Sequence, residues 1–170
     1  MKSLKTLLFL SFILLGFNGA KADPPTLSAA MHSVTKAYLD VKNALITNNV
    51  ATVQNKAMDL VRALNSVPDM NMTSDQHRLW FDYLSKLVFD SRHMNESSDI
   101  NHQREHFSSL SENMFTVLKK FNINKMTLYY QYSPQDRYYW ISETLAIKNP
   151  YNGTGNLLTK GETRETLRAK

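Results

Sequence analysis

The stretch Thr73–Met94 reads TSDQHRLWFDYLSKLVFDSRHM and predicts one long amphipathic helix. Thr73 and Gln76 are three positions apart, the spacing of a capping box in which each side chain satisfies a backbone N–H at the start of a helix. Apolar side chains then recur at steps of three and four, which puts them on one helical face. They are Leu79, Trp80, Tyr83, Leu84, Leu87 and Val88. Because an apolar face must be covered, the stretch predicts a neighbouring element that packs against it.

Three similar stripes surround this helix. Upstream, apolar positions recur over Leu27–Leu45 and again over Val50–Leu64, with a break at Asn48-Asn49. Downstream, a fourth stripe runs over Phe107–Phe121. Four amphipathic helices joined by short loops predict a mainly α fold, an up-and-down four-helix bundle. The pattern leaves open which faces the first two helices present to their partners.

The pattern changes after Asn122. The segments Met126–Tyr132 and Arg137–Ser142 are aromatic and β-prone, and the turn residues Ser133–Asp136 separate them. A second turn follows at Asn149–Gly153, and Leu157-Leu158 is a candidate third strand. So few short strands are not stable alone. We therefore predict a small aromatic β-hairpin or short sheet packed on the bundle.

Residues 1–22 are typical of a secretory signal peptide. Lys2 and Lys5 form a basic start, an apolar run covers Leu7–Phe17, and Ala20-Lys21-Ala22 precedes a cleavage point at Asp23. The run is shorter than the roughly 20 residues that a membrane-spanning helix needs. We expect an exported protein, periplasmic or secreted, with no membrane span after cleavage. The alternative is that the segment stays on the chain as an anchor.

Charge and cysteine content exclude several classes. The chain has no cysteine, which excludes disulfides and thiolate metal sites. Loss of Lys2, Lys5 and Lys21 from the 20 basic residues leaves 17 against 15 acidic ones, and residues 23–159 hold 13 of each. A neutral body argues against nucleic-acid binding. We expect one domain over residues 23–165 and a frayed, weakly basic end, with 166–170 as its tail.

Several short segments, spaced along about residues 30–165, resemble the motifs of a bacterial extracytoplasmic family of unknown function and occur in the same order. The shared segments are Tyr38–Leu45, Gln103–Phe107, Leu110-Ser111, Tyr129–Gln135, Trp140–Glu143, Asn149–Gly153 and Leu157–Gly161. Members of that family occur as small secreted proteins and also fused behind the periplasmic membrane-fusion subunit of copper/silver efflux pumps. The resemblance implies an envelope-side accessory domain with a heavy-metal connection and no established catalysis.

The chain departs from the family at the positions that would hold metal. Where the family has cysteine–proline–methionine, this sequence has Ser133-Pro134-Gln135. Where the family has methionine–leucine–threonine–cysteine–glycine, it has Leu157–Gly161, with Lys160 in place of the cysteine. Cu(I) and Ag(I) select thiolate and thioether ligands. The resemblance therefore implies a retained scaffold whose sulfur site is lost.

Two other groups keep a metal hypothesis open. Met70, Met72 and His77 are soft or borderline ligands close together in sequence, and His102 and His106 are four residues apart on one helical face. The alternative is that the methionines fill gaps in the core and the histidines face solvent. A periplasmic Cu(I)/Ag(I)-binding protein that uses these side chains is our second hypothesis for the function.

No catalytic motif is present, because Ser133 lacks a nucleophile elbow and no carboxylate pair is distinguishable. We expect a non-enzymatic protein without a cofactor, which docks on an envelope protein through its aromatic C-terminal region. The candidate docking residues are Tyr130, Tyr132, Ser133, Trp140 and Tyr151, and we expect Arg104 to brace that region. Tyr and Trp are common at interfaces, although a small internal core explains the same residues. Oligomeric state is left open.

Overall fold

The computed structural model describes residues 25–153 and 155–170. The predicted signal peptide, residues 1–22, lies outside the described residues. Four helices come first, and they are α1 (Leu27–Ile46), α2 (Val50–Asn65), α3 (Ser74–Glu96) and α4 (Ile100–Phe121). Three strands follow, and they are β1 (Leu128–Ser133), β2 (Tyr138–Ser142) and β3 (Glu162–Leu167). The predicted fold class, mainly α with a small C-terminal sheet, is confirmed.

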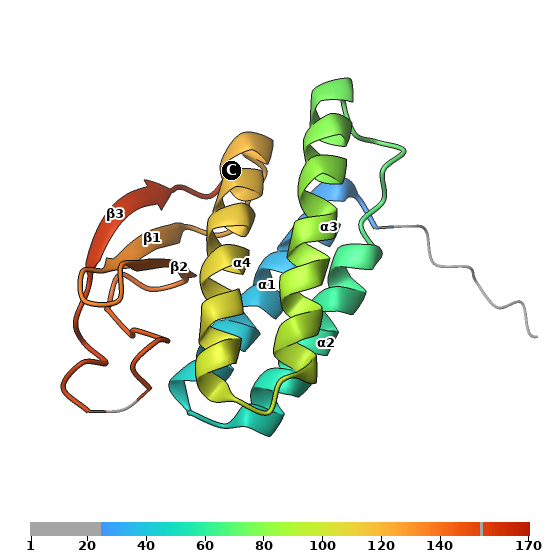
Figure 1. Cartoon of the computed structure of the whole chain (residues 1–170). Helices are drawn as coiled ribbons and strands as arrows, with labels where there is room; N and C mark the ends of the chain where they lie inside the picture. The colour runs from blue at the N-terminus through green and yellow to red at the C-terminus, as the bar shows by residue number, and fades with distance from the viewer. Residues whose placement is uncertain (1–24, 154) are drawn as a thin grey trace, which may run out of the picture.

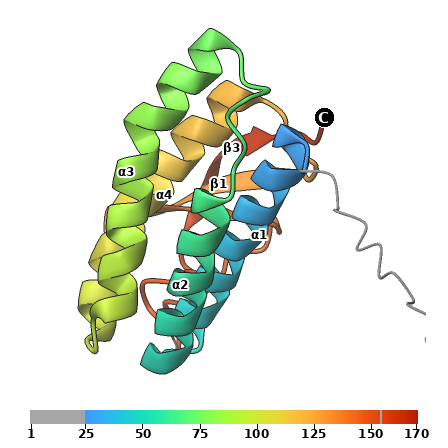
Figure 2. The same ribbon diagram turned by 90° about the vertical axis from the view of Figure 1, so that its right-hand side faces the viewer.

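The helices run alternately up and down, and consecutive helices lie side by side (Figures 1 and 2). Polar caps set their starts. Thr26 caps α1, Asn49 caps α2 and Asp99 caps α4, each by a side-chain oxygen that accepts from a backbone N–H of the first turn. The predicted capping box of Thr73 and Gln76 is present at α3.

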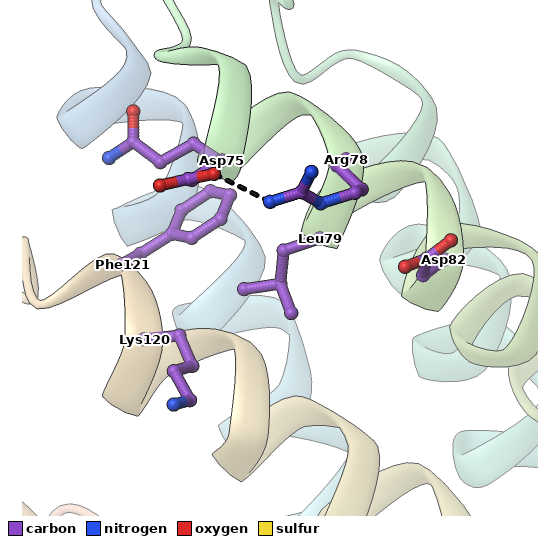
Figure 3. A pocket seen from close by; sticks show the side chains of 7 residues that line it. Asp75, Arg78, Leu79, Asp82, Lys120 and Phe121 are labelled. Carbon is purple, nitrogen blue, oxygen red and sulfur yellow. Dashed lines mark hydrogen bonds and ion pairs between the residues drawn. The ribbon is translucent and has the colours of Figure 1, made fainter.

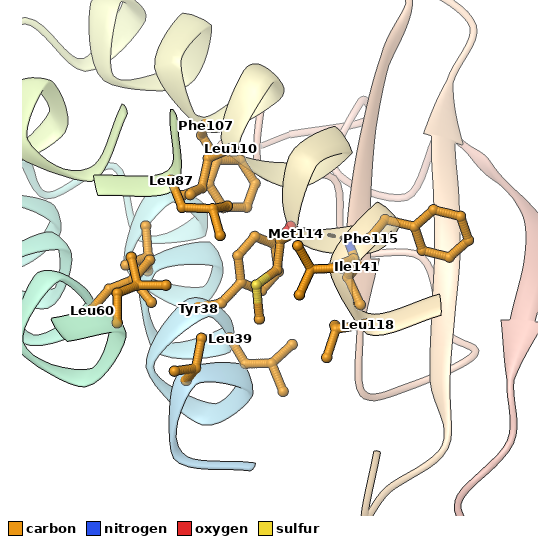
Figure 4. Close-up of a cluster of buried hydrophobic side chains, with 14 of the residues drawn as sticks. Tyr38, Leu39, Leu60, Leu87, Phe107, Leu110, Met114, Phe115, Leu118 and Ile141 are labelled. Atoms are coloured by element: carbon orange, nitrogen blue, oxygen red, sulfur yellow. Dashed lines mark hydrogen bonds between the residues drawn. The ribbon is translucent and has the colours of Figure 1, made fainter. Parts of the chain in front are cut away.

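Apolar faces from all four helices and from the sheet meet in one core (Figure 4). Tyr38 of α1 lies at its centre, fully buried and stacked on Phe107 of α4. Its hydroxyl lies 2.6 Å from the Ser111 hydroxyl and accepts from the Ile141 N–H at 3.0 Å. Burial raises the pKa of this phenol. One side chain thus links α1, α4 and β2.

The sheet is antiparallel in the order β2-β1-β3, and it lies beside α4 (Figure 1). Alternation gives each strand two faces. On one face Tyr130 stacks on Phe115 of α4, with ring centroids 3.7 Å apart. The other face carries Gln131 and Trp140, which are cross-strand partners and fully buried.

The connection from residue 143 to residue 161 covers that second face. The Gln131 amide donates to the carbonyls of Thr144 and Leu145 at 3.1 Å each. A Cβ on Gly161 would lie only 2.8 Å from the Trp140 ring. The sheet is therefore enclosed between α4 and a long loop, which explains how so small a sheet holds together.

Two predictions about the C-terminus are wrong. Leu157-Leu158 lies in a turn, and the third strand is Glu162–Leu167. The segment that we expected to fray, including residues 166 and 167 of the assigned tail, therefore pairs with β1. The charged residues and threonines of β3 suit an edge strand with one partner. The prediction relied on apolar content, and Leu167 is the one apolar residue of this strand.

Candidate functional site

A cluster of hydrogen-bonded polar side chains forms where the 143–161 loop meets the turn after β1. It consists of Ser133 and Asp136 from the end of β1 and its turn, and Asn149 and Asn152 from the loop, and is here called the polar turn cluster. The Ser133 hydroxyl donates to Asp136 Oδ2 at 2.6 Å. The Asn149 amide donates to the Ser133 hydroxyl at 3.0 Å, and the Asn152 amide donates to Asp136 Oδ2 at 2.8 Å. Ser133 and Asn149 are fully buried.

Asn149 also brings Ser133 close to Lys160. Its Nδ2 atom donates to the Lys160 carbonyl at 3.2 Å as well as to Ser133, and its backbone N–H donates to the Leu158 carbonyl at 2.7 Å. Its Oδ1 atom accepts from the Tyr151 N–H at 2.9 Å. The two positions at which the resemblance implies cysteine are therefore neighbours in space. The donor atoms that meet there are oxygen and nitrogen.

Arg104 ties this loop to the bundle. From α4 it donates to the Pro150 carbonyl at 3.2 Å and to Asn48 Oδ1, in the α1–α2 turn, at 3.1 Å. Burial lowers the pKa of its guanidinium, and the nearby Asp136 carboxylate opposes that shift. Arg104 thus braces the loop that carries Asn149, although the partners of its hydrogen bonds are not the tyrosines.

Replacement of Gly153 by alanine tests this brace. Gly153 has φ +57°, and a Cβ there would lie 2.8 Å from the Arg104 guanidinium. We expect a loss of about 2 kcal/mol in the free energy of unfolding, measured by urea denaturation, from backbone strain and displacement of Arg104. Gly155→Ala is the matched control, because its φ is +90° and nothing lies within 4 Å of its Cβ. Equal losses in the two variants would contradict the brace.

Three of the five candidate docking residues are buried, and their assignment to a docking surface is wrong. Ser133 belongs to the polar turn cluster, Trp140 lies beneath the 143–161 loop, and Tyr151 packs near Phe107 and donates to the Tyr139 carbonyl. Burial raises the pKa of Tyr151 well above its ordinary value. The aromatic residues are evident in the sequence. Their burial was not predictable, because the long loop that covers them has no periodic apolar pattern.

The remaining two candidates belong to a partly exposed aromatic stack. Tyr130 lies 4.8 Å from Tyr139, and Tyr139 lies 4.6 Å from Tyr132. The Arg164 guanidinium of β3 lies 4.9 Å from the Tyr132 ring centre. We call Tyr130, Tyr132, Tyr139 and Arg164 the tyrosine ledge. Tyr139 and Arg164 were missed by the sequence analysis, because the cross-strand register that brings them together depends on the turn and on β3.

The first group of candidate metal ligands is dispersed over separate environments. Met70 is 78% exposed, Met72 packs against the core cluster, and His77 lies against Phe81 with the ring centroids 4.5 Å apart and the planes tilted. His102 and His106, in contrast, do lie together at the start of α4, with ring centroids 4.7 Å apart.

An open hollow of about 420 Å³ lies where the start of α3 meets the end of α4 (Figure 3). Its lining includes Asp75 and Arg78, which form an ion pair on α3 at 2.6 Å. Both side chains are mostly exposed to water, and such pairs contribute little stability. The hollow therefore shows exposed charge rather than a buried group directed at a ligand.

A buried ion pair that the sequence did not reveal joins α1 to the end of β2. The Lys42 ammonium binds the Glu143 carboxylate, and the lysine is 2% exposed against 30% for the glutamate. Burial lowers the pKa of Lys42, and Glu143 only partly opposes this. Burial is the largest single influence on Glu143 and acts to raise its pKa. The hydrogen bonds from Lys42, Asn43 and the backbone, with the charge of Lys42, together outweigh burial, so the pKa lies below its usual value.

A model of the family described as "Protein of unknown function (DUF3347)" matches residues 34–126. The chain belongs to this family. The DUF3347 match begins within α1 and ends before β1, so it includes Arg104 but neither Ser133 nor Lys160. Searches of curated proteins and of solved structures gave no significant match. Within the described ranges, no helix combines the length and apolar character needed to cross a membrane.

Proposed function

We propose that the protein is a non-enzymatic, extracytoplasmic accessory domain that docks on another envelope protein. We further propose that it is related to heavy-metal efflux domains and has lost their sulfur site. The observation that carries the proposal is the closeness of the Ser133 hydroxyl and the Lys160 backbone carbonyl, which both accept from the Asn149 amide. The two positions at which the resembled family has cysteine, 133 and 160, are thus neighbours in the fold. Oxygen and nitrogen atoms are hydrogen-bonded to one another there.

The chemistry of this place supports a structural role. Hydroxyl, amide and carboxylate oxygens are poor ligands for Cu(I) and Ag(I). The Ser133 hydroxyl, the Asp136 carboxylate and the Asn149 amide already satisfy one another. A fully satisfied polar network rigidifies its surroundings. The network therefore holds the 143–161 loop against the sheet. The binding function is then expected at the neighbouring exposed surface of the sheet and not at the network itself.

The tyrosine ledge is the surface proposed for docking. Its rings are partly exposed on a sheet that is fixed on both faces, and Arg164 adds a cation at its edge. Rigid tyrosines with a neighbouring arginine are typical of residues that dominate protein interfaces. The alternative is a Cu(I)/Ag(I)-binding protein that uses Met70, Met72 and His77 or the pair His102 and His106. It is less well supported, because the first three side chains have separate environments, and two imidazoles lack the thiolate or thioether that Cu(I) selects.

Photo-crosslinking in cells tests the docking. A benzophenone amino acid at position 132 or 139 of the full-length chain is expected to give one and the same adduct with an envelope protein. The control position is Arg62, which is 71% exposed on α2. Absence of an adduct, or an identical adduct from position 62, would count against the ledge as the docking surface. Recovery of the protein only from the cytoplasmic fraction would overturn the proposed location.

A further inference from the structure

Three histidines meet where α3 ends and α4 begins. The His106 ring of α4 lies 4.8 Å from His93 of α3 and 4.7 Å from His102, measured between ring centroids. The Phe89 ring lies 4.0 Å from the His93 ring in a tilted arrangement and contacts His106 edge-on at 5.9 Å. His93 was absent from the residues singled out in the sequence, since it lies on a different helix.

Each of these rings has its Nδ1 atom next to an oxygen. His106 Nδ1 lies 3.0 Å from Asp90 Oδ1, and His93 Nδ1 lies 3.0 Å from the Phe89 carbonyl. His102 Nδ1 lies 3.4 Å from a Glu105 carboxylate oxygen. An ionised carboxylate accepts and cannot donate, so the Asp90 contact favours a proton on Nδ1 of His106. In the neutral ring the lone pair is then on Nε2, free for a ligand.

The buried carboxylate of Asp90 also indicates a ligand site. Its side chain is 5% exposed, and its hydrogen bond goes to His106. A carboxylate is costly to bury without a partner. A carboxylate that accepts from Nδ1 of a histidine is also the usual outer partner of a metal-ligating histidine, because it fixes the tautomer and the orientation of the ring.

The ring spacing suits a shared ion. Zinc binds imidazole nitrogen at about 2.0–2.1 Å, which puts ring centres roughly 3 Å from the metal and about 5 Å from one another in a tetrahedral site. The observed 4.7 and 4.8 Å agree with this. In the described residues, no three His, Asp or Glu side chains are already arranged around a metal position. Convergence of the Nε2 atoms therefore needs ring rotations.

These rotations are accessible to the two outer histidines. His102 is 47% exposed and His93 is partly exposed, and both line an open hollow of about 440 Å³ together with Glu96 and Asp99. Exposed side chains change between staggered rotamers readily. The acidic residues of the hollow attract a cation, and the open space leaves a coordination position for water.

We propose that His93, His102 and His106 bind one divalent transition-metal ion of the imidazole-preferring class, such as Zn²⁺, through their Nε2 atoms. Asp90 acts as a positioning residue for His106. Imidazole suits zinc, copper and nickel, whereas the sulfur ligands implied for relatives suit Cu(I). The inference does not depend on the proposed function, because the site is separate from the polar turn cluster and the tyrosine ledge.

Isothermal titration of tag-free protein, purified from cells that express the full-length chain, with Zn²⁺ tests the proposal. We expect one ion per chain. His102→Ala is expected to weaken binding at least tenfold without loss of folding, because that side chain is largely exposed. Asp90→Asn is expected to weaken it about 10–100-fold, as for other outer partners of metal ligands. His32→Ala is the matched control, since His32 lies near the start of α1, beside the end of α4 and not its beginning.

A second readout separates coordination from surface adsorption. With Cu²⁺ as the probe, the electron paramagnetic resonance spectrum should show coupling to several imidazole nitrogens, and His102→Ala should reduce their number. Urea midpoints of every apo variant establish that the fold is kept. Absence of Zn²⁺ binding, or equal weakening by His32→Ala and His102→Ala, would overturn the proposal. Failure of the crosslinking experiment would leave these results unchanged.

Discussion

The Asn149→Asp variant is expected to lose about 3 kcal/mol of unfolding free energy at pH 7, measured by urea denaturation. The new carboxylate cannot donate to the Ser133 hydroxyl or the Lys160 carbonyl, both of which the amide now serves. It also adds a second negative charge close to Asp136, since Asn149 Nδ2 lies 3.5 Å from Asp136 Oδ2. Two carboxylates at this distance cannot both ionise without a large cost.

Asn149→Ala is the control for the charge. It removes the same donors but adds no carboxylate, so its loss should be smaller and nearly independent of pH. The additional loss of Asn149→Asp should shrink as pH falls, because one carboxylate of the pair takes up a proton. Equal losses in the two variants at pH 7 would mean that position 149 does not share a site with Asp136.

Glu143→Ala is expected to cost about 3 kcal/mol, and Lys42→Met much less. Removal of Glu143 leaves the buried Lys42 ammonium without its partner. An unpaired charge in the interior is strongly destabilising. Removal of Lys42 leaves a carboxylate that is 30% exposed and can be hydrated. The Lys42→Met/Glu143→Ala double variant should approach wild-type stability, because an apolar side chain of similar length fills the place of the lysine. Urea midpoints of the four proteins give the cycle.

The same pair predicts a pH dependence. The pKa of Glu143 is lower in the folded protein than its ordinary value of 4.5. Stability from the ionised glutamate is therefore complete above about pH 4.5 and is lost as pH falls through the lowered value. The wild type should lose more stability than the double variant between pH 5 and pH 3. Parallel curves, or equal losses in the two single variants at pH 7, would contradict the pair.

The helices were predictable because their signals are local. The Thr73–Gln76 capping box, the break at Asn48-Asn49 and the apolar steps of three and four each depend on residues within a turn or two of one another. All of them correspond to observed caps, breaks and buried faces. The predicted membership of a family of unknown function is confirmed, whereas its connection to copper/silver efflux remains a proposal.

The sheet and the sites were only partly predictable, because they depend on contacts between distant residues. β3 has few apolar residues, and its pairing with β1 is interrupted by a bulge near Tyr130. Trp140 and Tyr151 were candidates for docking, with a small internal core as the alternative, and the structure places them in the core. No sequence pattern indicates that residues 143–161 fold back over the sheet. Asp90 and His93 could not be assigned to a site with His106, because the packing of α3 against α4 brings these residues together.

Titration with Cu(I) against a competing chelator tests the loss of the sulfur site most directly. Two proteins are compared in a His93→Ala/His102→Ala background, which removes the histidine cluster. One keeps Ser133 and Lys160, and the other carries Ser133→Cys, Gln135→Met, Leu157→Met and Lys160→Cys. If the sulfur site is lost, the first protein takes up no Cu(I) and the second holds one ion tightly. Tight, stoichiometric binding by the first that Ser133→Ala abolishes, or no gain in the second, would contradict it.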